Sequence, residues 1–176
     1  MPTPLGHALA GLAVAGIAGS RKPLPPAHIA ILVACATAPD LDLLLKFVDG
    51  ANHHRGFTHS LFAAFLAGAV ATALSFSGRS VPGAFAVGAA WASHVLLDFL
   101  GVDTSPPAGE MALWPFSSGF YVSPVSLFYD VPRSFTASAI RHNIAAVVIE
   151  IVVMVPVALV CWRRRPVTAN SSGLLH

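Results

Sequence analysis

Long apolar stretches that are almost free of charge are the feature of this sequence that most constrains its fold. Five of them cover residues 5–20, 26–38, 58–77, 82–101 and 140–162, about half of the 176 residues. A soluble domain carries about 25% charged residues, whereas this chain carries 10%. The pattern predicts an integral membrane protein. It excludes a soluble globular domain, a disordered chain and a nucleic-acid binder with a basic face.

The apolar stretches predict an all-α, polytopic membrane bundle of about five helices. A bilayer core of about 30 Å needs about 20 helical residues, and the last three stretches are that long. The first two are short. The turn between them holds Arg21 and Lys22, which would be costly at mid-membrane and so favour full crossing. Gly11, Gly16 and Gly19 predict close helix contact in the first stretch, because small residues let membrane helices approach.

The domain organisation follows from the same pattern. We expect a single membrane-embedded helical domain over residues 1–162. A long loop rich in aromatic residues occupies 102–139, and a basic and then polar tail, predicted to be disordered, occupies 163–176. A loop of this length usually marks function or disorder, and here it is expected to lie on the same side as the polar site described below.

If the chain crosses the membrane five times, the segments on one side hold cations but no acids. That side holds Arg21, Lys22, Arg79 and the arginines 163–165. The positive-inside rule makes it the cytoplasmic side. The N-terminus and the loop over 102–139 are then outside, and the C-terminus is inside.

Histidines and carboxylates gather at the opposite, outer ends of the stretches. Polar groups in membrane segments are costly and usually face a bundle interior or a cavity, so this clustering predicts one shared polar site. The candidate residues are His7, Asp40, Asp42, His54, His59, His94 and Asp98.

The residue types predict a divalent metal ion. Imidazole and carboxylate ligands without thiolates suit zinc first, and manganese or iron as alternatives. The candidates exceed four, which suits either two bridged ions or one ion with supporting partners. His94 and Asp98 are four residues apart and share one helix face. They could also simply bond to each other. The predicted ligands are His7, Asp40, His54, His59, His94 and Asp98.

Three residues of this region have candidate catalytic roles. Asp42 or Asp98, where free of the metal, could serve as the general base for a metal-activated water. Arg55 could bind an anionic oxygen of the substrate. Two alternatives stay open: residues 39–42 could be a helix stop with acidic turn residues, and Thr58 could cap the third helix.

Taken together, the motifs resemble the YdjM-like inner-membrane metal-dependent hydrolases. The similarity covers about residues 1–160 and implies a bacterial or archaeal inner-membrane protein that hydrolyses its substrate with a metal. Gly6 stands before His7 where the family usually has threonine. The motifs are Pro39-Asp40-x-Asp42, His54-Arg55-Gly56-x-Thr58-His59-Ser60, His94-x3-Asp98 and Leu113-Trp114-Pro115-Phe116-Ser117.

We therefore expect a hydrolase that cleaves a phosphoester or other ester of a membrane lipid at the outer interface. The aromatic residues of the loop could anchor it at the membrane interface, or the loop could act as a lid that covers the metal site and holds acyl chains. The alternative is a metal-ion transporter or sensor that uses the same cluster. A transporter needs polar residues through the bilayer, and the inner halves of the stretches are apolar apart from Thr72, Ser75 and Glu150. Glu150 is predicted to form a hydrogen bond between helices, with Ser93 or Thr72 as candidate partners.

Overall fold

The computed structural model describes residues 1–104 and 106–163, and every regular element within them is helical. Only isolated β-bridges accompany the helices in this part of the chain. The all-α prediction is confirmed, while residues 164–176 of the predicted tail lie outside the described residues. The elements are α1 (Pro4–Ala18), α2 (Pro26–Thr37), η1 (Ala38–Leu45), α3 (Lys46–Asp49), η2 (Phe57–His59), α4 (Leu61–Phe76), α5 (Ala84–Phe99) and α6 (Ala137–Arg163), η denoting a 3₁₀ helix.

Two helices begin at side-chain caps. Thr3 precedes α1, and its hydroxyl accepts a hydrogen bond from the Leu5 amide at 3.2 Å. Ser60 precedes α4, and its hydroxyl accepts from the Ala63 amide at 3.0 Å. Such caps satisfy amides that have no partner within the helix. The alternative that Thr58 caps this helix is wrong, because Thr58 lies in the 3₁₀ turn before it.

The second apolar stretch continues much further than its composition suggests. α2, η1 and α3 follow one another without a break over Pro26–Asp49, 24 residues in all. The α-helix itself ends at Thr37, and Pro39 lies in the first turn of η1, where a proline is tolerated. The alternative of a helix stop at residues 39–42 is therefore right for the end of the α-helix, but the chain continues as a 3₁₀ helix and not as a turn.

Two helical segments are long and apolar enough to cross a membrane: Pro26–Asp49 and Ala137–Arg163. α1, α4 and α5 are apolar but have only 15 or 16 residues. At 1.5 Å per residue they reach about 24 Å at most. The prediction that the second stretch is shorter than the last three is wrong, because this stretch forms one of the two long helical segments.

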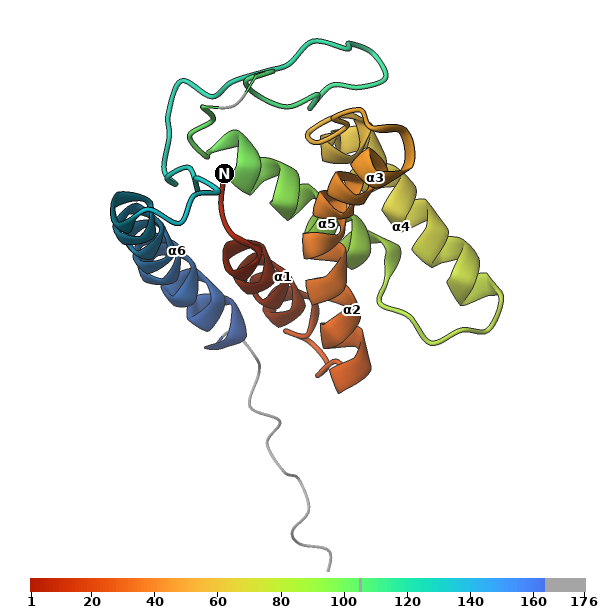
Figure 1. The fold of residues 1–176 in the computed structure, drawn as a ribbon. Coiled ribbons are helices and arrows are strands. Elements are labelled where there is room, and N and C mark those ends of the chain that lie inside the picture. The colour runs from red at the N-terminus through yellow and green to blue at the C-terminus, as the bar shows by residue number, and fades with distance from the viewer. Residues whose placement is uncertain (105, 164–176) are drawn as a thin grey trace, which may run out of the picture.

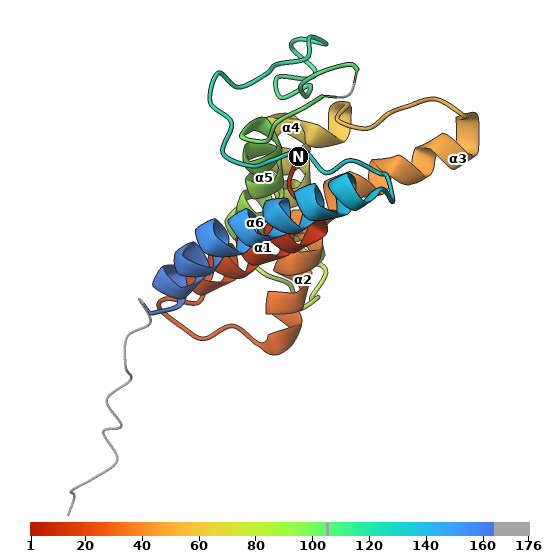
Figure 2. The ribbon, with the colours of Figure 1, turned by 60° about the vertical axis from the view of Figure 1, so that its left-hand side comes forward.

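α1 lies at the centre of the bundle, between α2 and α6, and α5 contacts both α1 and α2 (Figures 1 and 2). A Cβ atom at Gly11 would lie 2.8 Å from the Cα of Val33 in α2. A Cβ atom at Gly16 would lie 2.6 Å from the ring of Trp162 in α6. The predicted close contacts are confirmed at Gly11 and Gly16, where only glycine leaves room for the neighbour. Gly19 instead forms the C-cap of α1.

The helices bury small side chains and expose large apolar ones. Ala15, Ala36 and Ala90 are fully buried between the helices. On the outside of α4 and α5, Phe76 and Phe85 are 89% and 90% exposed. Such a large exposed apolar surface is unfavourable in water and fits a lipid surrounding.

The segment between α5 and α6 crosses one end of the bundle, at the top of Figure 1. Two backbone hydrogen bonds tie it to the turn that precedes α4. The amide of Met111 donates to the carbonyl of Arg55, and the amide of Leu61 donates to the carbonyl of Ala112, both at 3.0 Å. The loop is therefore held against the segment that contains His59.

Candidate metal centre

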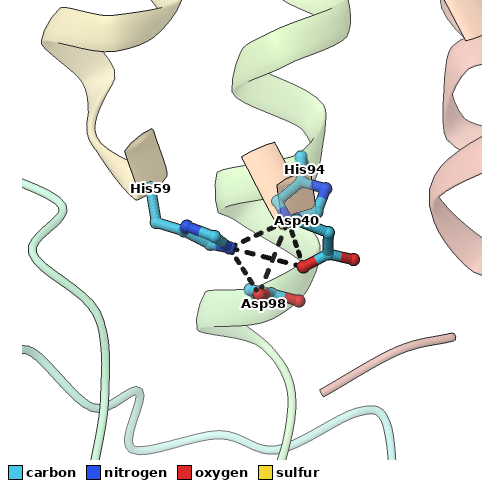
Figure 3. Close-up of side chains that lie close together, drawn as sticks. All are labelled: Asp40, His59, His94 and Asp98. Atoms are coloured by element: carbon cyan, nitrogen blue, oxygen red, sulfur yellow. Dashed lines mark hydrogen bonds and ion pairs between the residues drawn. The ribbon is translucent and has the colours of Figure 1, made fainter. Parts of the chain in front are cut away.

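Four side chains from three elements direct one atom each toward a common point (Figure 3): Asp40 from η1, His59 from η2, and His94 and Asp98 from α5. The Nε2 atoms of the two histidines are 3.1 Å apart. The distances from each Nε2 to Asp40 Oδ1 and Asp98 Oδ2 lie between 3.4 and 3.7 Å. Ligands about 2.1 Å from a tetrahedral zinc ion are about 3.4 Å apart. The four atoms have the spacing of one metal site.

The hydrogen bonds at the other ring nitrogens fix the orientation of both imidazoles. Nδ1 of His94 lies 2.8 Å from the carbonyl oxygen of Ala36, and Nδ1 of His59 lies 3.1 Å from Asp42 Oδ2. Both oxygens can only accept, so each Nδ1 donates a proton to its acceptor. The two Nε2 atoms, 3.1 Å apart, then need a positive charge between them, which is either a proton that one ring donates to the other or a metal ion.

The group is buried and its carboxylates lack other partners. His59 and His94 are 0% exposed. Asp40 Oδ1 and both oxygens of Asp98 have no hydrogen-bond partner within the described residues. Burying a charged oxygen without a partner is costly. A divalent cation would satisfy all these atoms and balance the two negative charges.

The pKa of His59 shows the same demand for positive charge. Burial by itself lowers this pKa, but the contacts with Asp40, Asp42 and Asp98 outweigh burial and raise it well above its ordinary value. In the absence of a metal, a proton therefore occupies the ring. A metal ion would replace that proton.

Asp42 lies behind His59 and does not belong to the four-atom group. Its Oδ2 faces Nδ1 of His59 and accepts the hydroxyl of Thr58 at 2.7 Å, while its Oδ1 lies 2.9 Å from Nδ1 of His54. A carboxylate that orients a ligand histidine is a common feature of metal sites. Both oxygens of Asp42 already have partners, so its contact with His59 is what the structure shows, and its role as general base stays a prediction.

His54 and His7 flank the group without sharing its centre. His54 directs Nδ1 to Asp42 and Nε2 to the sulfur of Met1 at 3.3 Å, and it forms a second possible ligand set with Asp42 and His59. His7 stacks on His94 with ring centroids 3.7 Å apart, and its Nε2 lies 3.3 Å from Asp98 Oδ1. Of the six predicted ligands, the structure thus brings four together at one point.

Arg55 lies beside the group, where its side chain pairs with Asp103 and is 8% exposed. Its backbone has a φ of 63°, a left-handed conformation that is uncommon outside glycine. The guanidinium lines a small cavity together with Asp98 and Glu110. Arg55 therefore stands close to the metal position, as its predicted anion-binding role requires.

Glu110 is a candidate functional residue that the sequence did not identify. It is 1% exposed, and neither carboxylate oxygen has a hydrogen-bond partner within the described part of the chain. Its backbone pairs with Tyr121, with N–O distances of 3.1 and 2.9 Å. Burial, and then the charge of Asp98, raise its pKa to about 9. A single acid in an irregular loop carries no motif, so only the folded chain shows its place.

Glu150 has a structural role at the start of α1. Its carboxylate accepts hydrogen bonds from the amide and hydroxyl of Thr3 at 2.7 and 2.5 Å, and from the amide of Gly6 at 3.1 Å. The predicted hydrogen bond between helices is confirmed, but its partners are not Ser93 or Thr72. Because these contacts hold the first turn of α1, they also position His7, the next residue.

Comparisons with known proteins agree with the membrane assignment. A family described as YdjM inner membrane protein matches residues 1–167. Inner membrane protein YbcI of Escherichia coli (strain K12) is 29% identical over 184 residues, which cover 94% of this chain and 100% of that protein. No solved structure matches this chain. Both names give a location and neither gives a reaction.

Proposed function

The chain belongs to the YdjM inner membrane protein family, and we propose that it is a membrane-bound, metal-dependent hydrolase. One divalent ion, with zinc as the first candidate, is held by Asp40, His59, His94 and Asp98. The observation that carries this proposal is the group of four ligand atoms, two imidazole nitrogens and two carboxylate oxygens, that all lie within 4.8 Å of one another. Manganese or iron would suit the same nitrogen and oxygen ligands.

The residues around the metal position supply the other parts of a hydrolytic site. A bound divalent ion provides Lewis-acid activation of water and of an ester oxygen. Arg55 binds an anionic oxygen of the substrate, in an orientation set by its ion pair with Asp103. Glu110 lines the same cavity as Arg55 and Asp98. Because its pKa is raised to about 9, it holds a proton at neutral pH and can donate it to a leaving oxygen.

The substrate is a phosphoester or other ester of a membrane lipid. Large apolar side chains cover the outside of the bundle, so a bilayer surrounds it and lipid reaches its edges directly. In the proposed multi-pass arrangement, the N-terminus and the metal centre face the outside and the C-terminus faces the cytoplasm. Arg21 and Arg79 follow α1 and α4 at the ends opposite to the metal centre, which supports this orientation through the positive-inside rule.

The proposal is tested by metal content and lipid hydrolysis on the detergent-purified protein. We expect one equivalent of zinc, manganese or iron by plasma mass spectrometry, and release of product from a panel of lipid esters and phosphoesters. The double variant His59→Ala, His94→Ala should lose both. His28→Ala is the matched control, because His28 lies at the start of α2, away from the metal ligands, and its Nε2 contacts the hydroxyl of Ser80 at 3.0 Å.

Three results would contradict parts of the proposal. Full metal content in the double variant would reject the four-residue site. Lipid hydrolysis by the double variant would reject the role of the metal in catalysis. Stoichiometric metal without hydrolysis of any lipid would reject the hydrolase and favour a metal sensor or transporter.

A further inference from the structure

A polar cleft of about 460 Å³ opens beside the metal centre. Asp42, His54 and Arg55 form the wall nearest the metal ligands, and Lys46 and Arg133 line it farther out. In that nearest wall, Asp42 comes from η1, and His54 and Arg55 come from the segment between α3 and η2. Arg133 comes from the segment before α6. The cleft is therefore built by parts of the chain that are distant in sequence and that meet at the site.

The cleft presents two exposed cations that a ligand can reach. Lys46 and Arg133 form no ion pair within residues 1–104 and 106–163, whereas the acids of the cleft already accept hydrogen bonds or an ion pair from neighbouring side chains. The acids and their partners are Asp42 with His54 and Thr58, Asp103 with Arg55, and Asp130 with His142 and Thr104.

An apolar groove of about 640 Å³ continues from this cleft along α6. Phe135, Ile140, Ile144 and Val148 line it, and it shares residues 131–133 with the polar cleft. One end of the combined site is therefore polar and carries the two exposed cations, and the other is apolar and faces outward from the bundle. A membrane lipid has the same two-part chemistry.

The shared segment is held in place by α6. Nε2 of His142 donates to the carbonyl of Asp130 at 2.9 Å, and the side-chain amide of Asn143 donates to the carbonyl of Pro132 at 3.1 Å. These contacts fix the junction where the polar cleft meets the apolar groove. They also hold Arg133 at that junction.

We propose that the cleft and the groove together bind one anionic phospholipid. Its phosphate-bearing headgroup lies in the cleft against Lys46 and Arg133, and one acyl chain lies along the groove on α6. Lysine and arginine are the side chains that recognise phosphate through charge-assisted hydrogen bonds. The inference rests on the proposed function in one respect, namely that the bound lipid is the substrate. Binding itself does not depend on hydrolysis.

Native mass spectrometry of the purified protein tests the inference by comparing its binding of phosphatidylglycerol and of phosphatidylcholine with matched acyl chains. We expect wild type to prefer phosphatidylglycerol. The double variant Lys46→Gln, Arg133→Gln should lose that preference through a fall of about tenfold or more in its affinity for phosphatidylglycerol. The matched control is Arg79→Gln with Arg141→Gln, which removes two exposed cations outside the cleft and the groove.

A second pair of variants tests the groove. Ile144→Trp should fill it and weaken binding of both lipids, whereas Ile151→Trp, at another exposed position on α6, should not. Equal affinity of wild type for the two lipids, or unchanged preference in the Lys46 and Arg133 variant, would overturn the inference.

The same measurement on His59→Ala separates the two proposals. This variant lacks a metal ligand but keeps the cleft, so it should still prefer phosphatidylglycerol. If wild type binds the anionic lipid with this preference yet hydrolyses no lipid, the hydrolase fails and the binding site stands. If wild type hydrolyses lipids without headgroup preference, the binding site fails and the hydrolase stands.

Discussion

Each imidazole in the metal centre is oriented by an acceptor that lies outside it. His59 depends on Asp42, and His94 depends on the carbonyl of Ala36. Only the first of these acceptors is a side chain and can be changed by mutation. The contribution of orientation can therefore be measured at Asp42 without removing a ligand.

Asp42→Asn should keep one bound metal but weaken its affinity about 10- to 100-fold. The neutral amide accepts the Nδ1 proton of His59 less strongly than a carboxylate and makes that ring a poorer ligand. Competition with a chromogenic chelator measures the affinity. Asp49→Asn is the control, because Asp49 is an exposed acid that pairs with His53. An unchanged affinity in Asp42→Asn would show that orientation does not matter here.

Glu110 should make the folded state less stable as pH rises. Its folded pKa is about 9, against 4.5 for the free side chain. Between these values the unfolded state releases its proton while the folded state keeps it, so unfolding becomes easier with increasing pH. Glu110→Gln removes this effect. In chelator-treated protein we expect the variant to melt several degrees above wild type at pH 8, and within about 2 °C of it at pH 5.

The control for this pH dependence is again an acid outside the site. Asp49→Asn should change the melting temperature little at either pH, because Asp49 is exposed. Equal differences between Glu110→Gln and wild type at both pH values would contradict a buried, protonated Glu110.

At the scale of elements, the sequence predicts where helices occur better than how they end. The apolar stretches locate α1, α4, α5 and α6 to within a few residues. No apolar stretch of its own predicts the 3₁₀ helix η1, which has only eight residues and whose conformation depends on packing. This turn directs Asp40 toward Nε2 of His59 and Asp42 toward Nδ1 of the same ring. Spacing alone could not separate a ligand from an orienting residue.

The close approach of α1 and α2 depends on Gly11. In Gly11→Ala the new methyl group would lie 2.8 Å from the Cα of Val33, so the helices would have to move apart. We expect a fall in melting temperature of about 5 °C or more, as for an overpacked core. Gly83→Ala is the matched control, since nothing lies within 4 Å of its added Cβ. Similar melting of the two variants would show that the α1–α2 contact is loose.

The whole molecule combines two long apolar segments with three helices too short for a bilayer of ordinary thickness. Helices of 15 or 16 residues can be accommodated where the bilayer thins locally or where polar flanks reach the interface. The metal centre lies at the start of α1 and α4 and at the end of α5, where such flanks occur. The chain thus brings its polar groups to one end of an otherwise apolar bundle.

This arrangement makes the sidedness of the two ends testable. The α4–α5 turn contains Arg79 and should be cytoplasmic by the positive-inside rule, whereas the segment before α6 adjoins the metal centre and should be outside. In a chain whose Cys35 and Cys161 are replaced by serine, a membrane-impermeant thiol reagent should label Ser134→Cys in spheroplasts, and Ser80→Cys only after lysis. Both positions are exposed, so each serves as the other's control. The reverse pattern would place the metal centre in the cytoplasm and exclude substrates that approach from the outer leaflet.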